Sequence, residues 1–161
     1  MDGPLNLRPR EHGDRFLVRT ATWLNLNWSG ERLTFAQMDA DPQLAAYYRF
    51  APDRGDYGLV ATTGNESIGV VWVTYFLAHA PGFGFVRADI PELSVCVLPG
   101  YRGTGVGTTL VDAAVAEARR RSLPGLSLSV EHGNPARRLY ERLAFAPVTS
   151  ARQPGTLARM L

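Results

Sequence analysis

The sequence of 161 residues contains one cysteine and no lysine, and what it lacks excludes several classes of protein. One cysteine cannot form an intrachain disulfide or a cysteine-rich metal site, and the three histidines are not spaced as metal ligands. No stretch approaches the roughly 18 apolar residues of a membrane span. The opening MDGPLNLRPREHGD lacks the apolar core of a secretion signal. We therefore expect a cytoplasmic protein that binds no metal and no membrane.

The charge balance gives little indication of a partner. All 17 basic residues are arginine, and the net charge of +2 is too small to indicate nucleic-acid binding. Hydrophobic residues make up 45% of the chain, which at this length is enough for a packed core. We expect one globular domain over residues 1–161.

The expected elements alternate in a way that mixes antiparallel and parallel strands. Capping residues and apolar spacing predict helices over 14–28, after Asp41, from about Gly105, and over 135–143. Alternating side chains predict strands at 5–9, 57–62, 68–76, 92–98, 126–130 and 156–161. Consecutive strands predict antiparallel pairs, whereas the strand–helix–strand unit over 92–130 predicts a parallel pair.

Apolar spacing also predicts which helix faces are buried. In the first helix this face holds Phe16, Leu17, Ala21 and Leu24. In the helix that starts near Gly105 it holds Val106, Leu110, Val111, Ala114, Val115 and Ala118. Asn134 and Pro135 carry the capping signal of the last helix.

The stretch YRGTGVGTTL over 101–110 places three glycines at the start of a predicted helix. Amides in the first turn of a helix have no intrahelical partner and lie at the positive end of its dipole. Gly103, Gly105 and Gly107 leave room for a bulky anion to reach these amides, and Arg102 adds a positive charge. A phosphate or diphosphate group is the expected ligand.

Other phosphate-binding loops fit this stretch poorly. Gly100 and Gly105 have the spacing of a P-loop, but Val106 stands where that loop requires lysine. Thr108 stands where a Rossmann fingerprint requires its third glycine. A glycine-rich turn without a ligand, and a nucleotide-binding protein that uses the same loop, both remain alternatives.

A longer region resembles the GNAT superfamily of N-acetyltransferases. Its signature R/Q-x-x-G-x-G/A matches Arg102, Gly103, Thr104, Gly105, Val106 and Gly107. A second motif matches Asn134, Arg138, Tyr140, Glu141, Leu143 and Phe145, so that the resemblance covers about residues 92–147. It implies a single-domain α/β fold of GNAT type. Its mixed central sheet is mostly antiparallel, contains a splayed parallel pair, and is flanked by helices.

The resemblance implies acetyl-CoA as cosubstrate and assigns residues to it. Loop residues 102–108, which end at Thr108, are expected to bind its pyrophosphate through their amides. The strand edge at Val95, Cys96 and Val97 is expected to hydrogen-bond the pantetheine arm. Asn134 is expected to contact that arm or cap its own helix, and Arg137 and Arg138 to meet the 3′-phosphate. An exposed helix face explains Arg138 equally well.

Two residues are the candidates for acid–base chemistry. Glu92, at the start of a strand, is the candidate base, because family members carry a glutamate there that acts through water, although a solvated glutamate at a strand start explains it equally well. Asp89 and Glu131 are weaker candidates. Tyr140 is the candidate acid for the leaving thiolate, although its spacing also fits a core position. Cys96 points with Glu92 and is expected to be a small buried side chain rather than a nucleophile.

The sequence thus predicts an N-acetyltransferase that passes acetyl from acetyl-CoA directly to a primary amine in a ternary complex. The acceptor is a small-molecule or protein amine, and the sequence does not choose between them. A catalytically silent CoA-binding module of the same fold is the alternative. Whether the chain forms a homodimer is left open.

Overall fold

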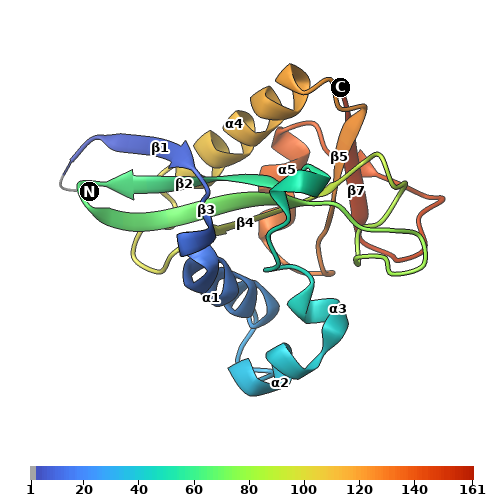
Figure 1. Cartoon of the computed structure of the whole chain (residues 1–161), viewed down its shortest axis with the longest axis horizontal. Coiled ribbons are helices and arrows are strands. Elements are labelled where there is room, and N and C mark those ends of the chain that lie inside the picture. The colour runs from blue at the N-terminus through green and yellow to red at the C-terminus, as the bar shows by residue number, and fades with distance from the viewer. Residues whose placement is uncertain (1–2) are drawn as a thin grey trace.

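The protein is built on one mixed sheet of seven strands, here described from a computed structural model over residues 3–161 (Figure 1). The strand order is β1-β2-β3-β4-β5-β7-β6. Every neighbouring pair is antiparallel except β4 and β5, which are parallel, as predicted. The strands are β1 (Leu5–Pro9), β2 (Tyr57–Thr63), β3 (Glu66–Thr74), β4 (Glu92–Val97), β5 (Gly125–Ser129), β6 (Ala146–Pro147) and β7 (Thr156–Met160).

Helices cover both faces of this sheet. They are α1 (Arg15–Leu26), α2 (Phe35–Ala40), α3 (Pro42–Ala45), α4 (Val106–Arg120) and α5 (Ala136–Arg142), with 3-10 turns at His12–Asp14 and Pro52–Arg54. Figure 1 shows α1, α2 and α3 on one side of the sheet and α4 on the other. None of the helices in residues 3–161 is long and apolar enough to cross a membrane.

Helix α4 matches its sequence pattern closely. The six residues predicted for its buried face are the six that the structure buries. They pack on the α4 side of β2, β3, β4 and β5 in the larger hydrophobic cluster, which also includes Tyr140 of α5. This packing fixes the start of α4, and therefore the glycine loop, against the end of β4.

Helix α1 buries its predicted face except at one position: Ala21 is buried, and Leu17 and Leu24 pack partly buried against the same cluster. Phe16 was expected in the core, but its side chain is 69% exposed. The buried positions are Val18, Ala21 and Thr22, which pack on the other face of the sheet. Thr22 is tolerated there because its hydroxyl donates to the carbonyl of Val18.

The segment between α1 and β2 contains a helix that the sequence analysis missed. Thr34 and Gln37 form a capping box that starts α2, and this signal is present in the sequence as TFAQ. The next helix, α3, begins as predicted, since the Asp41 side chain accepts from the amides of Gln43 and Leu44. It ends after four residues, shorter than expected. The two-residue strand β6 was also not predicted.

The parallel strands β4 and β5 pair at one end only. Their single register pair is Glu92 with Ser127, where the Ser127 amide donates to the carbonyl of Pro91. Beyond this point the strands diverge, as the splayed pair was predicted to do. The divergence leaves the second half of β4 without a strand partner on that side.

Candidate active site

A cleft of about 1050 Å³ lies where β4 and β5 separate. It is lined by the end of α1, by β4, by the glycine loop, by the end of β5 and by α5. The predicted site residues that line it are Glu92, Val95, Cys96, Val97, Arg102, Gly103, Gly105, Gly107, Thr108, Asn134 and Tyr140. One cleft therefore brings together residues from both sequence motifs and from the strand between them.

The glycine loop presents backbone amides that nothing in the protein uses. Helix α4 makes its first bond from the amide of Thr109 to the carbonyl of Gly105. Among the backbone hydrogen bonds of residues 3–161 outside the helices and strands, none has an amide of residues 102–108 as its donor. Gly103 and Gly105 have φ angles of +75° and +86°, which side chains rarely adopt. The sequence here selects a backbone that holds a row of free donors at a helix N-terminus.

The side chains of Arg102, Thr104 and Val106 in this loop each contact other parts of the protein. Arg102 donates through Nε to the carbonyl of Val97 at 3.2 Å. The Thr104 hydroxyl donates to the carbonyl of Tyr101, and the Val106 side chain is buried in the core. Thr104 and Val106 were predicted to bind the cofactor, and only their amides are available for this.

The open edge of β4 carries the backbone groups of Val95 and Val97. The amide of Leu98 donates to β3, at the carbonyl of Ile68. Because donors alternate along an antiparallel strand, Val95 and Val97 direct theirs away from β3. The carbonyl of Val95 accepts from Asn25 Nδ2 of α1 at 3.1 Å. No sequence signal marked Asn25, since its partner is a backbone atom 70 residues away.

Glu92 is buried at the closed end of the cleft, with 3% of its surface exposed. Its Oε1 accepts from the hydroxyl of Tyr47 at 2.6 Å and from the amide of Gly84 at 2.9 Å. Its Oε2 is buried without a hydrogen-bond partner among the described residues. Burial raises the pKa of Glu92 to about 7, although both hydrogen bonds act to lower it. A carboxyl group with this pKa can accept a proton near neutral pH.

Tyr47, one of several aromatic residues expected in the core or in an acceptor pocket, orients Glu92, a role that the sequence did not indicate. Its oxygen also accepts from the amide of Phe83 at 2.7 Å, and its ring stacks on that of Phe83. The loop approaches Glu92 so closely that a Cβ at Gly82 would lie 2.0 Å from Oε2. Burial raises the pKa of Tyr47, so that it remains a donor to Glu92.

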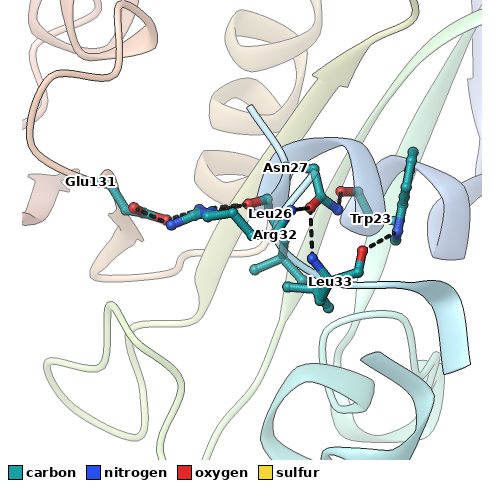
Figure 2. A network of polar contacts seen from close by, with 6 residues as sticks. All are labelled: Trp23, Leu26, Asn27, Arg32, Leu33 and Glu131. Carbon is teal, nitrogen blue, oxygen red and sulfur yellow. Dashed lines mark hydrogen bonds and ion pairs between the residues drawn. The ribbon is translucent and has the colours of Figure 1, made fainter. Parts of the chain in front are cut away.

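The two weaker candidate bases are both paired with arginine. Asp89 accepts from Arg87, and both side chains are exposed. Glu131 accepts from Arg32 at 2.6 and 3.0 Å, as Figure 2 shows. The arginine lowers the pKa of each carboxyl group, which makes it a poorer proton acceptor. Glu92 is therefore the better base of the three.

Tyr140 and Cys96 face the same cleft from opposite sides of the splay. Tyr140 is 8% exposed, and its hydroxyl has no hydrogen-bond partner among residues 3–161. Its pKa rises to about 12, first through burial and then through the nearby Cys96. Burial also raises the pKa of Cys96 to about 11, which keeps the thiol neutral and a poor nucleophile.

Besides Tyr140, the α5 region lines the cleft with Asn134, which precedes the helix and was predicted, and with Arg142, which was not. Asn134 lines the cleft, and its Oδ1 accepts from the amide of Ala136, so it also caps the helix. Arg142 lines the cleft without having been predicted, because its motif position gave no indication of it. Arg138 is exposed and lies outside the cleft lining.

Comparison with known proteins decides which family has this arrangement. The family model of the acetyltransferase (GNAT) family matches residues 19–145. The chain belongs to this GNAT family. It is therefore an acyl-CoA-dependent N-acetyltransferase, and acetyl-CoA is its cosubstrate. The predicted fold, with one splayed parallel pair in a mixed sheet, is confirmed.

Individual GNAT proteins resemble this acetyltransferase to different extents. It is 29% identical over 136 residues to a streptothricin acetyltransferase of Streptomyces lavendulae, covering 79% of this chain and 70% of that one. It is 30% identical over 70 residues to a [ribosomal protein bS18]-alanine N-acetyltransferase of Haemophilus influenzae, covering 42% and 48%. A GNAT acetyltransferase of Brucella melitensis, solved with acetyl-CoA, superposes with a TM-score of 0.65 at 18% identity, covering 98% and 88%.

Proposed function

We propose that this acetyltransferase passes the acetyl group directly to a primary amine, with both substrates bound in the cleft. The observation that carries the proposal is Glu92, a buried carboxyl group with one unpartnered oxygen and a pKa near 7. Such a group has little use in a purely structural role, because its burial is costly. The acceptor is a small molecule or a protein amine.

The residues around the cleft fit coenzyme A. The free amides of residues 102–108 suit a diphosphate, and Arg102 supplies a positive charge beside them. The backbone donors of Val95 and Val97 suit the amide groups of the pantetheine arm, with Asn134 on the opposite side. Arg138 is left as a candidate for the 3′-phosphate at the surface.

Glu92 and Tyr140 are proposed to handle the two protons of the reaction. An alkyl ammonium group has a pKa near 10.4, so freeing its lone pair at pH 7 costs about 4.6 kcal/mol. Glu92 takes one proton from the ammonium group, directly or through one water molecule, and the freed amine nitrogen forms its bond to the acetyl carbon. The bond from that carbon to sulfur breaks, and the Tyr140 hydroxyl donates its proton to the thiolate that leaves. The nitrogen loses its second proton as the tetrahedral intermediate collapses, and this proton restores the Tyr140 hydroxyl after its donation to the thiolate.

Both acceptor classes have support among the relatives. One is named for streptothricin, a small molecule, and the other for an alanine of a ribosomal protein. The streptothricin acetyltransferase aligns over 79% of this chain and the ribosomal-protein acetyltransferase over 42%, so the relatives give stronger support to a small-molecule amine.

Two measurements test the proposal together. Calorimetric titration measures binding of acetyl-CoA, and a thiol-release assay over a panel of primary amines, peptides included, measures transfer. Binding together with amine-dependent release of coenzyme A is the expected result. Binding without turnover on any amine would favour the catalytically silent CoA-binding module.

A further inference from the structure

The cleft extends beyond the residues that fit coenzyme A, and its other end surrounds Glu92. Glu92 begins β4, whereas the glycine loop follows the end of that strand. The cleft is lined near Glu92 by Tyr47, which follows α3, by Trp72 of β3 and by Phe83 of the loop before β4. We call these four residues the acceptor end, because they hold the proposed base and lie away from the glycine loop.

Two aromatic rings form a wall at the acceptor end. The rings of Tyr47 and Phe83 have their centroids 6.0 Å apart, and their planes differ by only 10°. Both residues are half-buried and line the cleft, so part of each ring is accessible from it. Trp72, which is 1% exposed, donates from Nε1 to the carbonyl of Tyr47 at 2.7 Å and so fixes the wall from the sheet side. A wall of this kind suits an apolar or aromatic group.

The polar groups of this wall are already used. The Tyr47 hydroxyl donates to Glu92 Oε1 and accepts from the amide of Phe83. The amide of Gly84 also donates to Oε1. Toward a substrate the acceptor end therefore offers ring surface together with one carboxyl group.

The charged side chains of the cleft leave a single carboxyl group for an ammonium ion. Among residues 3–161, those that line the cleft are Arg32, Glu92, Arg102, Glu131 and Arg142. Glu131 is bound by Arg32 through two hydrogen bonds. Glu92 is the other carboxyl group, and with a pKa of about 7 it carries at most one negative charge. The cleft thus has a counter-charge for one ammonium group and none for a second.

A second ammonium group on the acceptor would be bound unfavourably. Moving a charge out of water without a counter-charge is costly. The remaining charged groups of the cleft, Arg102 and Arg142, are cations and cannot serve as its partner. The first ammonium group meets the opposite situation, because both Glu92 and the faces of the aromatic rings attract a cation.

We propose that the acceptor is a monoamine that carries an aromatic ring, with the ring packed on Tyr47 and Phe83 and the ammonium group directed to Glu92. This inference rests on the proposed acetyl transfer and narrows its substrate to one chemical class. The hydroxyl of Tyr47 lies 2.6 Å from Glu92, so the wall and the carboxyl group adjoin. A short alkyl chain between ring and nitrogen is therefore sufficient.

Matched pairs of small amines test the charge and the ring separately. A thiol-release assay compares hexylamine with hexamethylenediamine, which differ in the second ammonium group, and phenethylamine with ethylamine, which differ in the ring. We expect kcat/KM to be about tenfold higher for hexylamine, after correction for the two equivalent amines of the diamine, and about tenfold higher for phenethylamine. A diamine used as well as the monoamine, or a ring without effect, would overturn the inference.

The same assay separates failure of this inference from failure of the proposed function. Turnover of peptide amines with none of the small amines would overturn the monoamine inference and leave acetyl transfer standing. Binding of acetyl-CoA without turnover of any amine would overturn both.

The variant Phe83→Ala tests whether the ring binds the acceptor. Its backbone amide, which donates to Tyr47, is kept, so the support of Glu92 should persist. KM for phenethylamine should rise about tenfold, whereas KM for ethylamine and the Kd of acetyl-CoA should not change. The control Phe16→Ala removes a ring of α1 that is 69% exposed and lies outside the cleft lining, and it should change none of these values.

An equal loss of activity toward both amines in Phe83→Ala would mean that the ring only supports the fold, which would overturn its role in binding. If this variant fails to fold, Phe83→Leu keeps apolar volume while removing the ring. The same rise in KM for phenethylamine alone is then expected, and unchanged values for both amines would contradict the inference.

Discussion

Arg32 and Glu131 lie 99 residues apart in the sequence and form a two-bond ion pair between opposite sides of the cleft (Figure 2). Arg32 also donates to the carbonyl of Leu26, at the end of α1, through Nε and Nη2. Asn27 Oδ1 accepts from the amides of Arg32 and Leu33, so the loop itself is held in shape. The pair therefore joins a preorganised loop after α1 to the segment that follows β5.

A double-mutant cycle on this ion pair should give a small coupling energy. The side chains of Arg32 and Glu131 are 42% and 49% exposed. Ion pairs this exposed contribute about 0.2–1 kcal/mol to stability. Arg32→Ala should cost more unfolding free energy than Glu131→Ala, because it also removes the bonds to Leu26. Denaturant unfolding at low and high salt measures both effects. A coupling above 2 kcal/mol that salt does not weaken would contradict this interpretation.

Two substitutions at Gly105 test separately whether the loop needs the backbone conformation of glycine and whether it needs a site free of negative charge. A Cβ at Gly105 would meet nothing within 4 Å, but its φ of +86° strains any side chain by about 1–2 kcal/mol. Gly105→Ala should therefore weaken CoA binding modestly. Gly105→Asp adds a carboxylate beside the free amides and should abolish binding measurable by calorimetry. Equal affinities of the two folded variants would refute the assignment of the diphosphate to this loop.

Much of the fold was predictable because its signals are local. The buried stripe of α4 and the cap at Asp41 depend on residues within a few positions of one another. One position of α1 was not predictable in this way. Phe16 fits an apolar stripe as well as Val18 does, and only the packing of α1 on β3 and β4 shows which one is buried.

The candidate site was predictable where a motif carries its chemistry, as with Arg102 and Gly105. The residues that hydrogen-bond to the site residues were not predictable. Tyr47 reaches Glu92 across 45 positions, and Asn25 reaches the carbonyl of Val95 across 70. Such contacts follow from how the helices pack on the sheet, and no spacing in the sequence encodes them.

The raised pKa of Glu92 should make the stability of the protein depend on pH. Its usual pKa is near 4.5, and in the folded chain it is about 7. Between these values the folded state binds more protons than the unfolded state, so the unfolding free energy falls as the pH rises through this window. The full effect is at most about 3 kcal/mol.

Glu92→Gln removes this titration, so the unfolding free energy of the variant should not fall over this pH range as that of the native chain does. Relative to the native chain, the variant should gain stability between pH 5 and pH 8, as denaturant unfolding at each pH would show. Its acetyl transfer should fall on the order of 100-fold, because the base is lost. A constant stability difference across this range would mean that Glu92 titrates normally.

Tyr140 and Tyr57 provide a matched pair for testing the role of the acid. The Tyr57 hydroxyl donates to the carbonyl of Ala114 at 2.7 Å, whereas the Tyr140 hydroxyl has no partner in residues 3–161. Tyr57→Phe should lower the unfolding free energy by about 1 kcal/mol and leave transfer unchanged. Tyr140→Phe should leave both stability and CoA affinity unchanged and lower kcat on the order of 100-fold. If Tyr140→Phe retained full turnover, the hydroxyl group would not protonate the thiolate, and Tyr140 would be a core residue that packs against Phe145.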